Sequence, residues 1–381
     1  MIVIDNHRIS MIDKPCEAIC MVKRAYNFYA GPATLPLDAL KRAQAELLDF
    51  ENTGVSILEI SHRSKQYDTM HNEACDLVKE LMGIPDDYKV MWVGGGASSQ
   101  FYMVPMNIGI PGKTMEYVHT GTWSKKAIAE AKLFGDVNVV ASSEDDGFSY
   151  IPKNVQFSED AAYAHITGNN TINGTEWMTW PDTPDNVPLI CDMSSNLMNR
   201  VIDVKKFGVI YAGAQKNLGP AGVTMIIARE DLIERAPKNI PTMIQWRTHA
   251  SKNSLFNTPP VFPIYMSKLA LDYLKSIGGI PEIERRNREK AKLIYDLIDN
   301  SGGYYKGHAK EDSRSLMNVT FNLPTPELEN QCFQEATARN LLGLKGHRSV
   351  GGMRASIYNA MTIEGVRELC SFLTEFQANN Q

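Results

Sequence analysis

The sequence predicts an α/β protein in which a large domain with a mostly parallel sheet flanked by helices is followed by a smaller α+β C-terminal domain. Two observations predict this fold. Up to about residue 276, short β-branched and aromatic runs alternate with longer segments whose apolar residues recur every three or four positions. From Leu316 onward, the order becomes strand, helix, strand and helix in a shorter unit. A chain of 381 residues is long enough for two unequal domains.

The expected boundaries divide the chain into four parts. Residues 1–25 are an extension of unknown role, which has neither a secretory apolar core nor the arginine-rich, acid-poor composition of a transit peptide. Residues 26–40 are expected to pack with the small domain. The large, cofactor-binding domain is expected to span 41–276 and the small domain 277–381.

Composition excludes several classes of function. The formal net charge of −5 and the lack of a basic run give no electrostatic basis for nucleic-acid binding. No apolar stretch approaches the ~20 residues that cross a bilayer. The six cysteines are scattered, and the one close pair, Cys16 and Cys20, has no partners for a metal site. We therefore expect no metal, free thiols and a cytoplasmic location.

Individual elements follow from apolar spacing and boundary residues. The segment after Ser64 has a helical apolar face and ends at Gly83, which favours a helix C-terminus. Thr325-Pro326 and Thr362 each predict a helix start. Further helices are predicted at 37–50, 121–134, 264–276 and 281–301, strands at 55–60, 90–93, 115–118, 316–321 and 353–357, and loops at 26–36, 169–175 and 257–260.

A strand–turn–strand segment at 209–228 contains a single lysine, Lys216, in a turn rich in glycine. Asp192 ends the apolar run 187–191 just upstream, and strand ends of an open α/β sheet meet at one edge. Pyridoxal phosphate needs an amine for a Schiff base and a carboxylate against its ring nitrogen. The pair therefore points to this cofactor, although the spacing alone is a weak signal, and Lys216 by itself would more often be a surface lysine.

A strand at 90–93 leads into three glycines at 94–96 and then a helix. Backbone N–H groups and the helix dipole at such a junction can hold a phosphate, although a plain flexible turn is the alternative. The loop has neither a dinucleotide nor a P-loop pattern. Trp123, at a predicted helix start, is either a core residue or an aromatic surface for a flat ring.

Several longer motifs resemble the phosphoserine aminotransferases, a family of fold-type-I pyridoxal-phosphate enzymes. The resemblance runs from about Tyr26 to the C-terminus. Its motifs are Tyr-Ala-Gly-Pro-Ala at 29–33, Glu-Ile-Ser-His-Arg at 59–63, the glycines at 94–96, the lysine segment at 212–222, Phe-Asn-Thr-Pro-Pro at 256–260 and the glycine-rich segment at 345–361.

The resemblance implies a role for each matching residue. Lys216 and Asp192 are implied to be catalytic, as the Schiff-base lysine and the partner of the ring nitrogen of pyridoxal 5'-phosphate. The further cofactor contacts implied are Gly96, Ala97, Ser98, Trp123, Thr171, Gln215, Asn257 and Thr258. Of these, Asn257 and Thr258 are implied to reach the cofactor of a second subunit, which makes a homodimer with shared sites.

Substrate contacts are implied in the same way. Arg354 is implied to bind the substrate α-carboxylate, and the distal anion is implied to contact His62, Arg63, His347 and Arg348. Arginine suits bidentate pairing with carboxylates and phosphates, although a surface salt bridge would explain any one of these cations alone.

The implied activity is reversible amino transfer between L-glutamate and 3-phosphohydroxypyruvate, giving O-phospho-L-serine and 2-oxoglutarate in L-serine biosynthesis. Both substrates would use one site in turn, with ping-pong kinetics. A second activity in vitamin B6 biosynthesis is also implied. One departure concerns Ala97-Ser98-Ser99, where some family members carry an arginine after the glycines. That difference leaves open how the distal carboxylate of glutamate is held.

Two alternatives belong to other kinds of protein. A pyridoxal-phosphate lyase or desulfurase would share the fold, but a desulfurase needs a cysteine on a mobile loop, and none lies beside the glycine-rich C-terminal segment. A non-enzymatic protein could use the glycine loop to bind a nucleotide. Only a lysine-bound cofactor would make the protein yellow.

Overall fold

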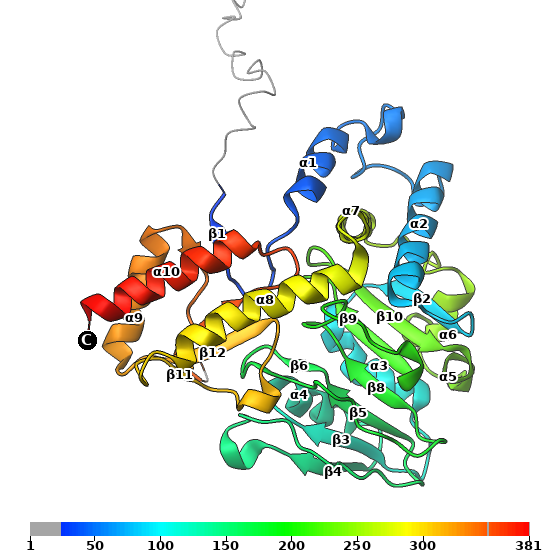
Figure 1. Ribbon diagram of the computed structural model, residues 1–381. Helices are drawn as coiled ribbons and strands as arrows, with labels where there is room; N and C mark the ends of the chain where they lie inside the picture. Colours follow the sequence, from blue (N-terminus) through cyan, green and yellow to red (C-terminus); the bar gives the residue numbers. More distant parts are fainter. Residues whose placement is uncertain (1–23, 349, 381) are drawn as a thin grey trace, which may run out of the picture.

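The structure is a computed structural model that describes residues 24–348 and 350–380 (Figure 1). Its centre is a seven-stranded sheet of order β2-β10-β9-β8-β5-β3-β4. The strands are β2 (Tyr88–Val93), β10 (Thr224–Arg229), β9 (Val209–Gly213), β8 (Leu189–Asp192), β5 (Tyr163–Thr167), β3 (Met115–His119) and β4 (Val137–Ser142). All neighbouring pairs are parallel except those of β10, which runs antiparallel to β2 and β9. The predicted mostly parallel sheet is confirmed.

Helices cover both faces of this sheet, so its strands are buried on both sides (Figure 1). Side chains alternate between the faces along each strand. In β9, Ile210 packs in the core beneath α2 (Lys65–Met82) and α7 (Val261–Ser276). Tyr211 packs in the opposite core, which holds residues of α3 (Gly96–Ile108) and α4 (Thr122–Ala131). The shorter α5 (Glu230–Arg235) and α6 (Trp246–Ser251) contribute to this second core.

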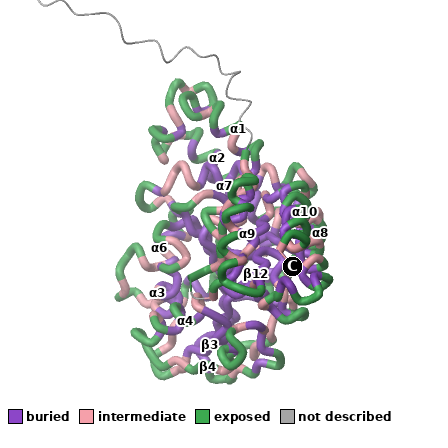
Figure 2. The backbone as a smooth tube through the Cα atoms, turned by 90° about the vertical axis from the view of Figure 1, so that its left-hand side faces the viewer, coloured by how far each residue is buried: buried purple, intermediate pink, exposed green. Residues whose placement is uncertain are grey.

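The C-terminal part builds a separate core around a three-stranded sheet of order β11-β12-β14. Its elements are α8 (Gly279–Asp299), β11 (Lys306–Gly307), β12 (Asn318–Asn322), α9 (Pro326–Ala338), β13 (Leu341–Leu342), β14 (Met353–Ser356) and α10 (Ile363–Asn379). Thr325 and Thr362 cap α9 and α10 by accepting backbone N–H hydrogen bonds, which confirms these predicted helix starts. Figure 2 shows the buried backbone of both parts enclosed by exposed segments.

The N-terminal segment joins this C-terminal unit. Residues 26–36 were expected to be loop, but β1 (Tyr26–Asn27) pairs in parallel with β13. Phe28, which is fully buried, belongs to the C-terminal core. The pairing spans more than 300 positions of sequence, which no local pattern predicts. Residues 1–23 of the expected extension, including Cys16 and Cys20, lie outside the described residues.

Two further predictions were wrong in detail. The predicted strand at 55–60 is a turn, in which the Ile60 N–H donates to the Ser56 carbonyl and the Ser56 hydroxyl donates to the Leu47 carbonyl. The predicted helix 37–50 ends at Glu46 as α1 (Leu37–Glu46), and η2 (Phe50–Asn52) follows. These local hydrogen bonds replace a strand partner, and only Ile57 and Ile60 of the turn are buried.

The expected loop at 169–175 is a buried hairpin of β6 (Asn169–Asn170) and β7 (Thr175–Glu176). Its polar side chains form hydrogen bonds with both the large sheet's loops and the C-terminal unit. The Asn169 amide donates to the Ser195 hydroxyl and to the Asn318 side-chain oxygen, each at 2.8 Å. The Asn318 amide in turn donates to Ser356 on β14. The hairpin is therefore fixed to two strands of the C-terminal sheet.

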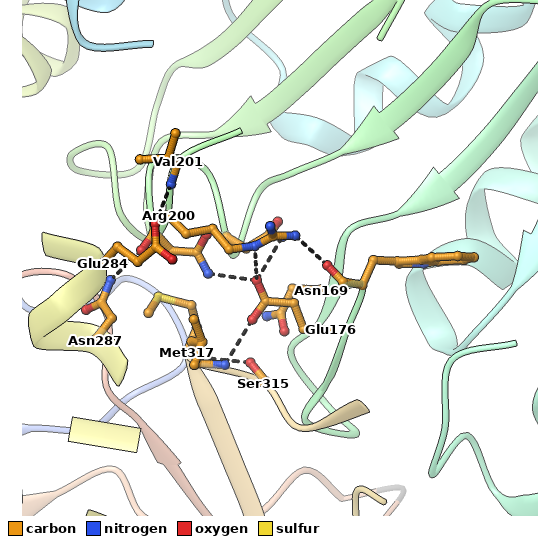
Figure 3. Close-up of polar contacts among 12 residues, drawn as sticks. Asn169, Glu176, Arg200, Val201, Glu284, Asn287, Ser315 and Met317 are labelled. Carbon is orange, nitrogen blue, oxygen red and sulfur yellow. Dashed lines mark hydrogen bonds and ion pairs between the residues drawn. The ribbon is translucent and has the colours of Figure 1, made fainter. Parts of the chain in front are cut away.

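Glu176 is the centre of this junction (Figure 3). Its carboxylate, fully buried, accepts hydrogen bonds from the Asn199 amide at 2.7 Å and from the Leu316 N–H at 2.9 Å. The Arg200 guanidinium lies 3.8 Å away. Burial raises the pKa of the Glu176 carboxyl, and the hydrogen bonds and Arg200 oppose that rise. One carboxylate thus joins the hairpin, the segment after β8 and the start of β12.

Among the described residues, no helix is long and apolar enough to cross a membrane. The same residues contain no group of three or more His, Cys, Asp or Glu side chains placed to hold a metal ion. Cys75, Cys191, Cys332 and Cys370 are free thiols, as the sequence predicted for them.

We expect Glu176→Gln to lower the free energy of unfolding by about 2–4 kcal/mol. The new side-chain NH2 would face the Asn199 amide or the Leu316 N–H, and both of these donors need an acceptor. Urea titration measures this loss. Glu289→Gln on the exposed side of α8 is the matched control, and it should change stability by less than about 0.5 kcal/mol. Equal effects of the two substitutions would contradict a central role for Glu176.

Candidate active site

A cavity of about 300 Å³ lies where the carboxyl ends of β5, β8 and β9 meet the C-terminal unit. This volume is at the lower end of the range for small-molecule sites. Its lining includes ten of the predicted residues, namely Gly96, Ala97, Ser98, Trp123, Thr171, Asp192, Gln215, Lys216, His347 and Arg354. They come from seven separate places in the chain, which only the fold brings together.

Lys216 lies in the tight turn between β9 and β10. The Lys216 and Gly219 N–H groups both donate to the Ala214 carbonyl, at 2.7 and 2.8 Å, which curls the chain around the lysine. A side chain at Gly219 would lie only 2.4 Å from the Ser267 hydroxyl, so only glycine fits there. The Lys216 Nζ points to Thr171 and donates to its Oγ1 at 2.7 Å.

The charge state of Lys216 is set by its surroundings. The pKa of Lys216 is lowered to about 8, mainly by burial and further by the Arg354 guanidinium, whereas the nearby Asp192 carboxylate opposes the shift. The lysine is thus far more often a neutral amine near neutral pH than a solvated lysine would be. A neutral amine is the form that reacts with an aldehyde or accepts a proton.

Asp192 is the last residue of β8 and is 6% exposed. Its Oδ1 accepts hydrogen bonds from the Ser194 N–H at 2.9 Å and from the Ser194 hydroxyl at 2.6 Å. The same hydroxyl accepts from the Gly213 N–H, so Ser194 links the ends of β8 and β9. Burial raises the pKa of Asp192, whereas these hydrogen bonds and Lys216 lower it. The carboxylate is therefore held in a fixed orientation in the cavity wall.

The glycine loop forms the start of α3. Gly95 and Gly96 have φ values of 93° and 70°, which favour glycine, and a side chain at Gly95 would meet Ser99 at 2.9 Å. No side chain caps the helix. The first-turn N–H groups near Ala97 and Ser98 can therefore bind an anion in the cavity.

Arg354 and Trp123 complete the wall. The Arg354 Nη1 donates to the Thr171 carbonyl at 3.3 Å, while its Nε is buried with no hydrogen-bond partner among the described residues. Such a buried donor fits a carboxylate ligand. The Trp123 ring centroid lies 5.9 Å from the Lys216 Nζ, so the indole borders the same space.

Five predicted residues do not line this cavity. His62 and Arg63 precede α2, and the exposed Asn257 and Thr258 precede α7. Arg348 lines a neighbouring groove that includes Glu329. The structure thus brings ten of the predicted residues together in one cavity, and the roles of all fifteen stay predictions.

Sequence reasoning missed other lining residues. They are Ala30, Gly31, Phe101, Thr167, Asn169, Ile172, Ser194 and Ser195. Ser194 could have been found, because it follows Asp192 by two residues and a serine at that spacing can cap a carboxylate. The others are ordinary residue types whose position depends on tertiary structure alone.

Comparison with known proteins agrees with this geometry. The family model described as Aminotransferase class-V matches residues 25–369. That match covers well over half of the chain. The fold and the site therefore define a class-V aminotransferase that uses pyridoxal phosphate.

Sequence relatives and solved structures show which family of class-V aminotransferases the chain belongs to. Phosphoserine aminotransferase from Desulfosudis oleivorans is 56% identical over 94% of this chain and 100% of its own, and that from Bacillus subtilis is 51% identical over the same shares. The solved phosphoserine aminotransferase from Bacillus circulans subsp. alkalophilus has 50% identity and a TM-score of 0.93, with 94% and 100% of the two chains covered. The chain belongs to the phosphoserine aminotransferase family.

A structure of the Trichomonas vaginalis phosphoserine aminotransferase is described as bound to pyridoxal phosphate, at 39% identity and a TM-score of 0.87, with 92% and 100% of the two chains covered. The residues of the present cavity fit that cofactor. They provide an amine, a buried carboxylate, an indole face and an uncapped helix N-terminus around one space.

We expect covalent attachment of pyridoxal 5'-phosphate to the apoenzyme to become faster as the pH rises through about 8, because only the neutral Lys216 amine reacts. Borohydride trapping after short incubations over a pH series measures the midpoint. In Asp192→Asn, the charge that raises the lysine pKa is removed, so the midpoint should move to lower pH. A midpoint near the ordinary lysine value of 10.5 in the wild type would contradict this assignment.

Proposed function

We propose that the enzyme transfers the amino group reversibly between L-glutamate and 3-phosphohydroxypyruvate, giving O-phospho-L-serine and 2-oxoglutarate in L-serine biosynthesis. The observation that supports this proposal most directly is a single cavity that contains Lys216, Asp192 and Arg354. The Lys216 amine there has a lowered pKa, and the Arg354 Nε has no hydrogen-bond partner among the described residues. The identity to named phosphoserine aminotransferases supports the choice of substrates. A cytoplasmic location is part of the proposal.

Pyridoxal 5'-phosphate, when bound, supplies an aldehyde for amino groups and a ring that takes up electrons from the substrate Cα. The Asp192 carboxylate would keep the ring nitrogen protonated. The Lys216 amine would take the proton from the substrate Cα and deliver it to the carbon atom of the cofactor's aldehyde group. The N–H groups near Gly96, Ala97 and Ser98 would bind the phosphate.

Other side chains would orient the reacting groups. The Trp123 indole would lie against the ring, and Thr171 and Gln215 would provide hydrogen bonds to the cofactor. The Thr171 hydroxyl already accepts from the Lys216 Nζ, so it also holds the amine in place. Arg354 would bind the α-carboxylate through its unpaired Nε, a contact open to every amino-acid substrate.

The proposal includes a homodimer with shared sites. Asn257, Thr258, His62 and Arg63 lie away from the cavity of their own chain, which is the arrangement expected if they serve a partner's cavity. The arm formed by α1 and η2 extends from the body at the top of Figure 1. Its exposed apolar residues are Leu37, Leu47, Leu48, Val55 and Leu58. An apolar surface of this kind favours an interface.

The reaction itself can be tested by half-reactions. The lysine-bound form of the enzyme should be yellow and should be bleached by borohydride. Glutamate and O-phosphoserine should each remove this yellow colour when added alone, without the second substrate. Arg354→Ala should reduce kcat/KM for both by about two to three decades, since it removes roughly 2–4 kcal/mol of charge-assisted binding to the α-carboxylate. Loss with one substrate alone would contradict that role, and no reaction of the wild type with O-phosphoserine would overturn the proposed function.

The shared site predicts complementation between two inactive variants. Lys216→Ala removes the reacting amine, and Thr258→Arg should block the partner's phosphate site. In a heterodimer, both substitutions fall on one site and leave the other intact. Mixing the variants under exchange conditions should therefore restore up to about half the wild-type activity per heterodimer. Lys216→Ala mixed with itself is the control, and heterodimers without activity would argue against a shared site.

A further inference from the structure

Lys126 lies on α4 one turn after Trp123. Residues three apart on a helix share a face, so both side chains point the same way. The Lys126 Nζ lies 4.7 Å from the Trp123 ring centroid. Trp123 lines the cavity, so the exposed Lys126 ammonium lies next to a residue of the cavity wall. Within residues 24–348 and 350–380, no carboxylate forms an ion pair with it.

A second line of evidence comes from His347, which lines the same cavity. The pKa of His347 is lowered by burial and, in decreasing order, by Arg354, Arg348 and Lys126. Lys126 is therefore close enough to His347 for their charges to interact, although α4 and the loop before β14 are far apart in sequence. The three charged groups named here, Arg354, Arg348 and Lys126, are all cations.

This concentration of positive charge favours an anionic ligand. A phosphate monoester carries close to two negative charges and three strong acceptors near neutral pH. Under the proposed function, Arg354 is occupied by the α-carboxylate, and Arg348 lines the neighbouring groove. Lys126 then supplies a further positive charge beside this wall of the cavity. An ammonium is a flexible point charge and suits a phosphate that enters from solvent.

We infer that Lys126 contacts the phosphate group of the substrate and determines selectivity for phosphorylated over plain amino acids. The inference rests on the proposed function and adds a residue that no sequence motif indicated. Its two independent supports are the position of Lys126 over the Trp123 indole and its proximity to His347. A role limited to packing on the indole would instead affect all substrates equally, because the indole borders the space that every substrate enters.

The test compares Lys126→Gln with the wild type in single-turnover half-reactions with O-phosphoserine and with serine. We expect the ratio of the two kcat/KM values to fall about tenfold, the size of one charge-assisted contact that is partly solvated. The inhibition constant for inorganic phosphate should rise by a similar factor. Lys126→Arg should retain most of the selectivity, since it keeps the positive charge.

Nuclear magnetic resonance titration of His347 gives a readout without turnover. Its pKa should rise in Lys126→Gln, because a neighbouring cation is removed. Lys125→Gln is the matched control, since Lys125 is the adjacent exposed lysine of α4, and it should change neither the ratio nor the His347 pKa. An unchanged ratio in Lys126→Gln, or equal losses with both substrates, would overturn the inference. A wild type that does not react with O-phosphoserine would instead overturn the proposed function.

Discussion

The burial of an ammonium and a carboxylate in one small cavity is the constraint on which the site depends. Neither Lys216 nor Asp192 would be favourable there without compensation, because burial disfavours both charged forms. The protein compensates each group differently. Asp192 is held by two hydrogen bonds from Ser194, whereas Lys216 responds with a lowered pKa. The result is a fixed anion beside an amine that is ready to exchange a proton.

The sheet places these two groups correctly because their strands, β8 and β9, are parallel neighbours that end at one edge. The C-terminal unit then closes the cavity with Arg354 on β14. The buried polar junction around Glu176 and Asn169 aligns this unit with the sheet. Hydrogen bonds in such a junction are directional, so they fix relative orientation more strictly than apolar packing would.

The sequence predicted those features that are locally encoded. Apolar runs predicted the strand that ends at Asp192 and the two strands that flank the Lys216 turn, and cap residues such as Thr325 predicted helix starts. The prediction of a strand at 55–60 was wrong because β-branched residues form a strand only where a partner strand is available. The hairpin at 169–176 was missed because its polar residues are satisfied by distant partners such as Asn318.

The site was predictable to the extent that its chemistry is unusual in sequence. A lysine among glycines and a carboxylate at a strand end are recognisable, and the family resemblance identified Thr171 and Arg354. Lys126 carried no such signal, because a lysine on a helix is ordinary and its meaning comes only from Trp123 and His347. His62 and Asn257 cannot be assigned within one chain, since their proposed function lies in a second.

The antiparallel direction of β10 has a mechanical consequence for the lysine. Gly213 at the end of β9 pairs with Thr224 at the start of β10, so the turn that carries Lys216 is anchored to the sheet at both ends. The turn is also held along its length, because the Asn217 amide donates to the Leu197 carbonyl and the Ala33 N–H donates to the Gln215 carbonyl. The travel of the amine is then limited to rotations about its own four side-chain carbons. A movement of the C-terminal unit relative to the sheet would therefore carry Arg354 away while Lys216 and Asp192 keep their separation.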